Sequence, residues 1–392
     1  MFMKKKVFIL LVVVLTIMSV ALVGCKGGGA LTIPVGVNAE LTGDIPSVGA
    51  SCKNAALLAV KEVNDAGGLD IGGKKYTIKL FIEDNGGKAD QAAAVTQKLI
   101  TQDNVVAVIG PNASRYAIPA AAVAESSKVL MISPWSTNPK LTIDPNTGQP
   151  AKYVFRACFT DSFQGQVVAK FAMEKLGAKK AAVLYDVASE YNKGIADVFK
   201  NTFEKLGGQV VAFETYTTGD KDFSAQLTKI KQANPDVIFL PNYYNEVPLQ
   251  IQQAHRLGIT ATFIGSDSWG AEDLIKLGGK DVEGYFFSTH YARDIPAPAT
   301  QKFISAYTAA YGSVPDDVAA LTYDSFGLLF EALKTANKID RQAVRDALAT
   351  LSRYEGVTGT LQFKEGSGDP IKSAVILQIK DGKFVYYATA NP

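Results

Sequence analysis

Short apolar runs alternate along the chain with longer stretches whose apolar residues recur at helical spacing. The runs are typical of buried strands and lie at 31–37, 76–83, 105–109, 129–132, 180–185, 209–216, 237–240, 262–264 and 284–288. The helical patterns between them lie at 50–64, 88–102, 114–126, 162–176, 192–206, 223–232 and 247–257. Strands that alternate with helices of this length predict parallel sheets covered by helices on both faces.

This alternation occupies two blocks that divide near residues 153–161, and the pattern then changes. Helical patterns at 299–311, 316–335 and 341–351 follow one another, and strand patterns at 359–363, 373–380 and 383–387 close the chain. Asp381-Gly382 lies between the last two strands and predicts a tight hairpin turn. The length of 392 residues also favours about two domains.

The N-terminus has the pattern of an export signal. Lys4, Lys5 and Lys6 precede an apolar run at 7–17, and the stretch ends in Leu22-Val23-Gly24-Cys25. The cysteine after Leu-Val-Gly makes this segment similar to a lipoprotein signal, so we expect a signal peptide at 1–24, lipidation of Cys25 and a tether at 25–30. An uncleaved membrane anchor is the alternative, although the run is short for a spanning helix. We therefore predict an extracytoplasmic protein, lipid-anchored to a bacterial cell membrane.

Composition narrows the function further. The formal charge of +2 includes the three signal lysines, so the mature chain is close to neutral and has no basic excess for nucleic acid. Cys52 and Cys158 could form one disulfide or remain buried thiols. No second apolar segment is long enough to cross a membrane.

Catalytic and metal-binding patterns have little support. Of the two histidines, His255 falls on an amphipathic helical pattern and is expected at the surface, whereas His290 follows a strand and could line a cleft. We find no Cys-x-x-Cys, His-Glu-x-x-His, Gly-x-Ser-x-Gly or phosphate-binding loop. The sequence therefore predicts no enzyme, no metal and no cofactor.

A binding site has better support, because ligands of parallel sheets settle beyond the carboxyl ends of the strands. The strand at 105–109 leads into Ser114, which we expect to cap a helix, and the strand at 129–132 leads into Trp135 and Thr137. Hydroxyls beside a helix N-terminus favour an anion such as a carboxylate, although ordinary capping explains each turn equally well.

The second block supplies a negative group. Asp267 follows the strand at 262–264 and stands two residues before Trp269, so an ammonium group could pair with the carboxylate and face the ring. A solvated loop aspartate is the alternative. An anion site in one block and a cation site in the other suggest a zwitterion, an α-amino acid, held between them.

The chain from about residue 31 resembles the periplasmic leucine/isoleucine/valine-binding proteins, which are solute receptors of ATP-driven (ABC) importers. The resemblance rests on motifs in matching order that include Glu62-Val63-Asn64-Asp65-Ala66-Gly67-Gly68, Val108-Ile109-Gly110-Pro111, Ile132-Ser133-Pro134, Tyr153-Val154-Phe155-Arg156 and Gly219-Asp220-Lys221-Asp222-Phe223. It implies a type I periplasmic binding protein fold, in which two doubly wound parallel-sheet lobes joined by three hinge strands close on the ligand. The lobes are expected at 31–155 plus 288–357 and at 156–287 plus 358–392.

The same resemblance assigns ligand-binding residues. Ser114 and Thr137 match carboxylate-binding hydroxyls, and Asp267 matches the acidic residue that pairs with the ammonium, usually a glutamate. The position of Trp135 offers a backbone carbonyl to the ammonium. Tyr191 and Tyr243 match aromatic residues of the pocket.

Departures from the family pattern leave the ligand open. Val48 stands where a pocket tyrosine is common, Trp135 where a small residue is common, and Asp267 is shorter than glutamate. A pocket that also holds Trp269 or His290 could favour an aromatic amino acid. Arg115 could recognise a second acid group, but is more readily placed in solvent.

We therefore predict a monomeric solute-binding lipoprotein of an ABC importer. It binds a branched-chain or aromatic amino acid by hinge closure and docks on a membrane permease. The alternative is a receptor for an amide, urea or aromatic acid, in transport or as a sensor subunit.

Overall fold

The computed structural model describes residues 31–144, 146–364 and 366–392. The predicted signal peptide at 1–24, the lipidation residue Cys25 and the tether at 25–30 all precede these residues, so they remain predictions. Ile33–Pro392 clusters as one unit and contains two large sheets. Among the described residues, no helix combines the length and apolarity needed to cross a membrane.

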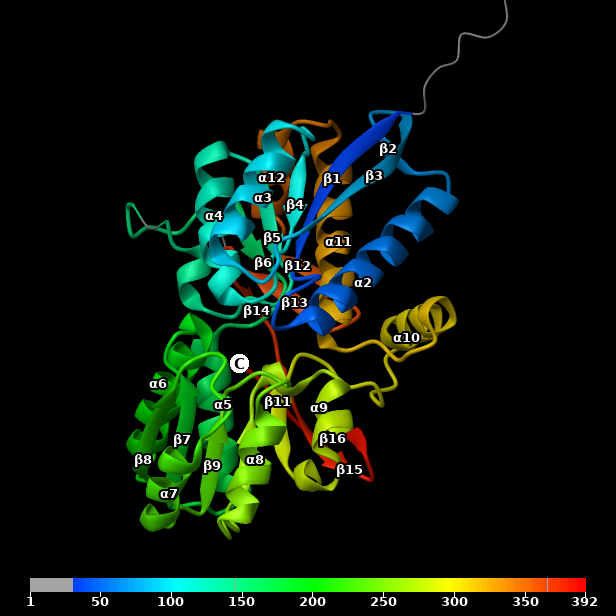
Figure 1. Ribbon diagram of the computed structural model, residues 1–392. Helices are drawn as coiled ribbons and strands as arrows, with labels where there is room; N and C mark the ends of the chain where they lie inside the picture. The colour runs from blue at the N-terminus through cyan, green and yellow to red at the C-terminus, as the bar shows by residue number, and fades with distance from the viewer. Residues whose placement is uncertain (1–30, 145, 365) are drawn as a thin grey trace, which may run out of the picture. The chain divides into compact units, whose positions relative to one another are not determined.

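The first sheet has six strands in the order β2-β3-β1-β4-β5-β6 (Figure 1). Its strands are β1 (Thr32–Ala39), β2 (Leu69–Ile71), β3 (Lys74–Asp84), β4 (Ala107–Ile109), β5 (Leu130–Ser133) and β6 (Val154–Arg156). The pairs β1–β4, β4–β5 and β5–β6 are parallel, and β2 runs antiparallel to its neighbour β3. The predicted parallel core is therefore confirmed, with one short antiparallel edge that the apolar pattern missed.

Helices bury both faces of this sheet, because successive residues of a strand point to opposite faces and both sets are apolar here. In β4, Val108 packs in a cluster with α3 (Ala89–Thr101) and α4 (Ser114–Ser127). Ala107 and Ile109 belong to the cluster that also includes residues of α2 (Pro46–Asp65) and α11 (Asp317–Ala336). α10 (Pro298–Tyr311) contacts α2, and α12 (Arg341–Ala349) contacts α11. We call this sheet with its helices the first lobe.

The second sheet has seven strands in the order β16-β15-β11-β10-β9-β7-β8. They are β7 (Lys180–Asp186), β8 (Gln209–Tyr216), β9 (Val237–Leu240), β10 (Thr262–Gly265), β11 (Phe286–Thr289), β15 (Ala374–Lys380) and β16 (Lys383–Ala390). β7 to β11 are parallel, whereas β15 and β16 form the predicted hairpin and run antiparallel to their neighbours. The helices are α5 (Asp161–Glu174), α6 (Glu190–Lys205), α7 (Ser224–Ala233), α8 (Val247–Arg256) and α9 (Asp273–Gly278), and with them this sheet forms the second lobe.

The chain crosses between the lobes three times, as the family resemblance implies: after β6, after β11 and before β15. A small sheet of β12 (Arg353–Gly356), β13 (Gly359–Phe363) and β14 (Pro370–Ile371) precedes the last crossing. Arg156 at the end of β6 is fully buried and donates from Nε to Asp369, which lies 2.6 Å away just before β14. This ion pair fixes two of the three crossings to each other. The boundaries at 155/156, 287/288 and 357/358 remain predictions.

Candidate functional site

Six residues from both lobes line one narrow space at the carboxyl ends of the strands. From the first lobe come Ala113 and Ser114, after β4, and Trp135, after β5; from the second come Tyr191, Tyr243 and Asp267. The side chains leave no room for a water molecule between them. The structure therefore brings together five of the six residues that the family resemblance assigned to the ligand.

Ser114 occupies a different helix position from the one expected. It is the first residue of α4, and the N-cap position belongs to Ala113, which has no capping side-chain bond. The Ser114 hydroxyl instead accepts hydrogen bonds from the Ser136 hydroxyl at 2.9 Å and from the Asn138 backbone N–H at 3.4 Å. The capping prediction was wrong, and these contacts tie the start of α4 to the loop after β5.

Thr137 lies one step away from this space. It is 1% exposed, its hydroxyl has no hydrogen-bond partner among the described residues, and its carbonyl accepts from the Asp161 N–H at 2.8 Å. Asp161 begins α5 and is also buried, with no partner for either carboxylate oxygen in the described chain. Burial raises the pKa of Asp161 to about 8.

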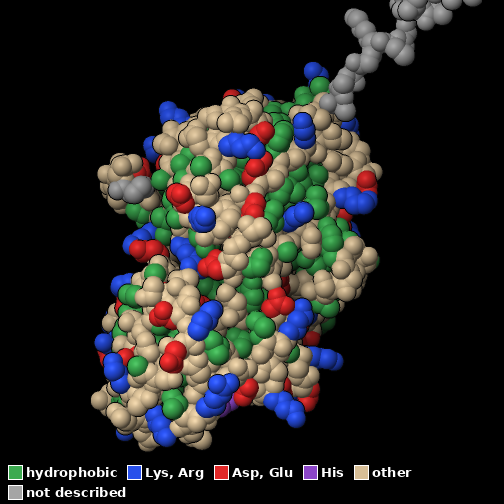
Figure 2. Space-filling model, in the orientation of Figure 1, with side chains coloured by type: hydrophobic (Ala, Val, Ile, Leu, Met, Phe, Trp, Pro, Cys, Tyr) green, Lys and Arg blue, Asp and Glu red, His purple; other side chains and the backbone are tan. Residues whose placement is uncertain are grey.

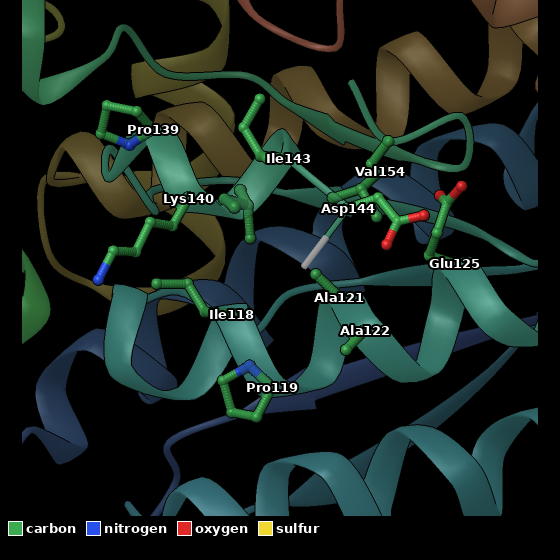
Figure 3. A pocket seen from close by; sticks show the side chains of 12 residues that line it. Ile118, Pro119, Ala121, Ala122, Glu125, Pro139, Lys140, Ile143, Asp144 and Val154 are labelled. Carbon is green, nitrogen blue, oxygen red and sulfur yellow. The ribbon is translucent and has the colours of Figure 1, made fainter. Parts of the chain in front are cut away.

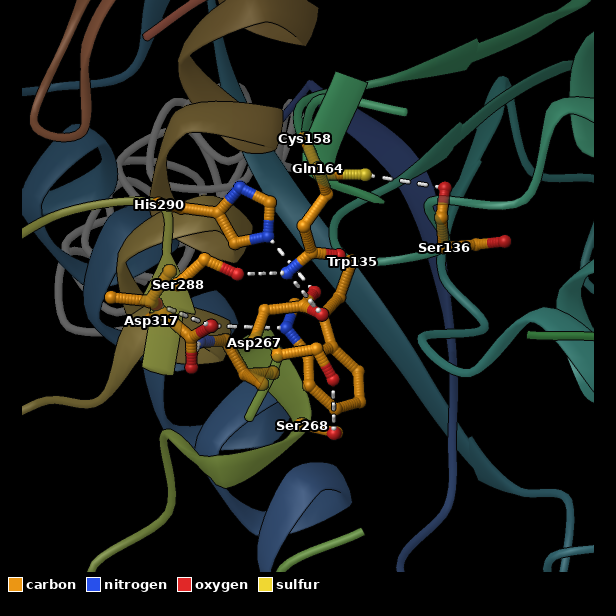
Figure 4. Close-up of polar contacts among 12 residues, drawn as sticks. Trp135, Ser136, Cys158, Gln164, Asp267, Ser268, Ser288, His290 and Asp317 are labelled. Carbon is orange, nitrogen blue, oxygen red and sulfur yellow. Dashed lines mark hydrogen bonds and ion pairs between the residues drawn. The ribbon is translucent and has the colours of Figure 1, made fainter. Parts of the chain in front are cut away.

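Asp267 is held by three side-chain donors (Figure 4). Its Oδ1 accepts from Gln164 Nε2 at 3.0 Å and from the Tyr191 hydroxyl at 2.6 Å, and its Oδ2 lies 3.1 Å from His290 Nε2. Burial lowers the pKa of His290 to about 4, although Asp267 acts in the opposite direction, so the imidazole is neutral near pH 7 and donates from Nε2. A buried carboxylate of this kind is suited to pair with a cationic group as its next partner.

Trp135 is anchored on the other side of the space. Its indole N–H donates to Asp317 Oδ2 at 3.1 Å, and the Thr289 hydroxyl donates to the same oxygen at 3.0 Å. Asp317 begins α11, and burial raises its pKa well above the usual range. Asp267, His290 and Asp317 offer ligand atoms within 4.8 Å of one another, but Asp267 and Asp317 already accept hydrogen bonds from neighbouring side chains.

Arg115 lies between the lobes rather than in solvent, where the sequence analysis placed it. Its side chain is 15% exposed and forms an ion pair with Asp44 of the first lobe at 2.5 Å. The guanidinium also donates to the Thr218 hydroxyl of the second lobe at 3.3 Å and lies 5.3 Å from the Tyr243 ring. Arg115 thus contacts both lobes beside Tyr243, one of the residues that line the space.

Two other aromatic or apolar candidates lie away from this space. Trp269 is fully buried, donates from Nε1 to the Leu240 carbonyl at 3.0 Å and packs against Gly265, where any side chain would collide with the ring. Its indole therefore faces the core of the second lobe, and the expected aromatic neighbour of an ammonium at Asp267 is not there. Val48 lies in α2 within the main core. His290 borders the site only through Asp267.

Sequence reasoning missed Gln164, Asp317 and Asp161, which support the site from helix starts. Each lies near the first turn of α5 or α11, and polar residues there are usually interpreted as caps. The local sequence does not distinguish a residue that caps its own helix from one whose side chain contacts a distant residue of the site. Cys52 and Cys158 are free, buried thiols, so the disulfide alternative was wrong.

A wider pocket lies elsewhere, between α4 and the turn η1 (Pro139–Thr142) (Figure 3). It offers about 480 Å³ and is lined mostly by apolar side chains such as Ile118, Pro119 and Val154. It contains none of the predicted site residues, and its polar groups Glu125 and Asp144 accept hydrogen bonds from nearby backbone N–H groups. The chemistry for a charged ligand is therefore in the narrow space between the lobes.

Comparison with known proteins agrees with this geometry. The model of a family described as periplasmic binding proteins matches residues 32–383. Leu/Ile/Val-binding protein homolog 3 of Brucella melitensis is 31% identical, over 93% of this chain and 96% of its own. The leucine-, isoleucine-, valine-, threonine- and alanine-binding protein of Pseudomonas aeruginosa is 30% identical, over 85% and 86%.

Solved structures show the same relation. The leucine-binding protein LivK of Thermotoga maritima is 35% identical and superposes with a TM-score of 0.85, covering 92% of this chain and 99% of its own. LivJ of Streptococcus pneumoniae, solved in complex with isoleucine, is 35% identical with a TM-score of 0.84, covering 92% and 100%. The chain therefore belongs to the periplasmic binding proteins, a family of extracytoplasmic transporter receptors rather than enzymes, and is a substrate-binding protein of the branched-chain amino acid ABC transporter type.

Proposed function

We propose that this protein binds an aliphatic α-amino acid as a zwitterion between its two lobes and delivers it to an ABC permease. The observation that carries the proposal is the meeting of Ser114 at the start of α4 with Asp267 of the second lobe around one space. The helix N-terminus and the hydroxyl favour the ligand carboxylate. The Asp267 carboxylate, which Gln164 helps to hold in place, favours the ligand ammonium.

The lobe contacts explain how binding is coupled to closure. Arg115 contacts Thr218, the Asn138 side chain donates to the Glu190 carbonyl at 2.8 Å, and Asn245 donates to the Asp44 carbonyl at 2.8 Å. These bonds exist only when the lobes approach each other, so a ligand that bridges Ser114 and Asp267 shifts the population toward the closed form. The closed form is then the one that docks on the permease.

Anchoring and surface charge fit a receptor at a membrane. Lipidation at Cys25 and the tether at 25–30 would hold a monomer near its permease in the cell membrane. The face in Figure 2 carries interspersed acidic and basic side chains rather than one basic patch. Two relatives are named for branched-chain amino acids, and LivJ is described with isoleucine.

Calorimetric titration tests the proposal. The protein is unfolded and refolded to remove carried-over ligand, then titrated with alanine, valine, leucine, phenylalanine, benzoate and urea. Binding of at least one aliphatic amino acid, but not of its N-acetyl derivative, is expected, because acetylation removes the ammonium. Binding only of benzoate or urea would replace this proposal with the acid or amide alternative.

A further inference from the structure

Two glycines of the second lobe lie where that lobe touches the first lobe. Gly194 lies in α6, one turn after Tyr191, and Gly270 ends the short turn η2 (Asp267–Trp269). Each therefore adjoins a residue that lines the narrow space between the lobes. For these two alone among the described glycines of the second lobe, the nearest atom that an added Cβ would meet, apart from the local backbone, belongs to the first lobe.

The first contact is between α6 and the loop after β5. A Cβ at Gly194 would lie 2.9 Å from Asn138 Nδ2, whereas non-bonded heavy atoms prefer separations of about 3.5 Å or more. Asn138 has little freedom to move away, because its Nδ2 donates to the Glu190 carbonyl at 2.8 Å and its Oδ1 accepts from the Lys140 N–H at 3.0 Å. The bond to Glu190 itself joins the two lobes. A methyl group at position 194 would therefore compete with a contact that stabilises the closed form.

The second contact is between η2 and the start of α11. A Cβ at Gly270 would lie 2.6 Å from Asp317 Oδ1 and 3.1 Å from Asp317 Cγ. This carboxylate is held in place, because Oδ1 accepts from the Val318 N–H at 3.0 Å and Oδ2 accepts from the Thr289 hydroxyl at 3.0 Å. The backbone of Gly270, with φ −69° and ψ −9°, is open to residues other than glycine. The position thus needs glycine for space and not for conformation.

We propose that Gly194 and Gly270 are closure residues. The absence of a side chain lets the second lobe reach the first lobe at both points, and a methyl group at either one holds the lobes apart. In the open form the lobes separate, so the same methyl group meets no first-lobe atom. A substitution here therefore weakens the closed, ligand-bound form selectively. The inference rests on the proposed function only in taking the ligand to bind between the lobes.

Titration calorimetry with alanine, valine, leucine and isoleucine tests the inference on the refolded wild type and its variants. Gly194→Ala and Gly270→Ala should each raise the dissociation constant of the tightest ligand at least tenfold, and Gly270→Val should raise it further. In stopped-flow tryptophan fluorescence the loss should appear mainly as a faster dissociation rate, because the open cleft still admits the ligand. Dissociation constants of both alanine variants within threefold of the wild type overturn the inference.

Stability measurements separate an effect on closure from damage to the fold. Alanine favours a helix more than glycine does, so Gly194→Ala should not lower the urea midpoint of the ligand-free protein even though it weakens binding. Gly278→Ala is the matched control. Its Cβ would lie 2.4 Å from Val282 of the same lobe, so it should lower the midpoint and leave the affinity unchanged. If Gly278→Ala weakens binding as much as the two closure variants, crowding within one lobe explains their effect and the inference fails.

A ligand-free experiment keeps this inference apart from the proposed function. Lys140 and Glu190 form an ion pair between the lobes at 2.6 Å, so Lys140→Cys and Glu190→Cys place two thiols that meet only when the lobes approach each other. A short bis-maleimide should link these thiols, since the native thiols at 52 and 158 are buried. Adding Gly194→Ala or Gly270→Ala should slow the linking at least fivefold, and equal rates overturn the inference. Slower linking in a protein whose wild type binds no amino acid overturns the proposed function and supports the inference.

Discussion

Replacing Asp267 with asparagine tests the central electrostatic contact of the proposed site. The side chain keeps its shape but loses its charge, and the new NH₂ group faces donors, since Gln164, Tyr191 and His290 all donate to this carboxylate. Asp267 is 1% exposed, so an ammonium bound there is shielded from water. When the Asp267 charge is removed, water cannot replace it as the partner of the ammonium.

The magnitude follows from this burial. Removing one partner of a buried, hydrogen-bonded charge pair costs about 2–5 kcal/mol. Every 1.4 kcal/mol is about a tenfold change in dissociation constant, so the affinity for the amino acid should fall about 30-fold to several thousandfold. Asp267→Glu, which keeps the charge, should retain far more of the affinity.

Calorimetric titration of the refolded variants with the best wild-type ligand measures the change. Asp324→Asn is the control, because Asp324 is an equally buried carboxylate whose partners, such as Thr358, lie away from the lined space. It should reduce stability but leave the affinity unchanged. An Asp267→Asn affinity within threefold of wild type, in a folded protein, would refute the assignment of the ammonium to Asp267.

Three further outcomes are expected. Arg115→Ala removes the contacts to Asp44 and Thr218 and should raise the ligand dissociation rate several-fold in stopped-flow tryptophan fluorescence; an unchanged rate contradicts its role in holding the lobes together. Because burial raises the folded-state pKa of Asp161 to about 8, folded protein binds the proton more tightly than unfolded protein, so stability falls from about pH 4 to pH 8 by up to about 1.4 kcal/mol per pH unit for this group. Asp161→Asn should remove that slope in urea denaturation, and an identical pH profile in both proteins rejects the buried, unpaired carboxyl. Gly49→Ala places a Cβ 2.1 Å from the Glu40 carbonyl oxygen and should lower the free energy of unfolding by about 3 kcal/mol, which an unchanged urea midpoint disproves.

The regular elements were largely readable because their signals are local. Strands such as β9 (Val237–Leu240) and β13 (Gly359–Phe363) have the predicted bounds. The continuous apolar run of β9 and the alternating pattern of β13 each have few alternative structures between polar turns. β2, β12 and α9 were missed because three to six residues with mixed burial show no period. Tertiary pairing, not propensity, stabilises elements of this length.

The site was only half readable for the same reason. Ser114, Trp135, Tyr191, Tyr243 and Asp267 follow strand ends or begin a helix, and topology sends such residues to one edge of each sheet. Which way their side chains point depends on distant partners. Trp135 is set by Asp317, 182 residues away, and Trp269 turns into the core because Gly265 leaves room for its ring.

The sequence by itself determined the β/α alternation, the two sheets and the strand ends from which a zwitterion site is built, because apolar period and turn chemistry act over a few residues. Only the tertiary structure decided how much space those residues leave. Arg115 bridges the lobes, Trp135 fills the gap and Asp267 gathers three donors because side chains far apart in the chain meet there. Packing density and hydrogen-bond satisfaction depend on these long-range contacts, so no single segment of the sequence encodes them.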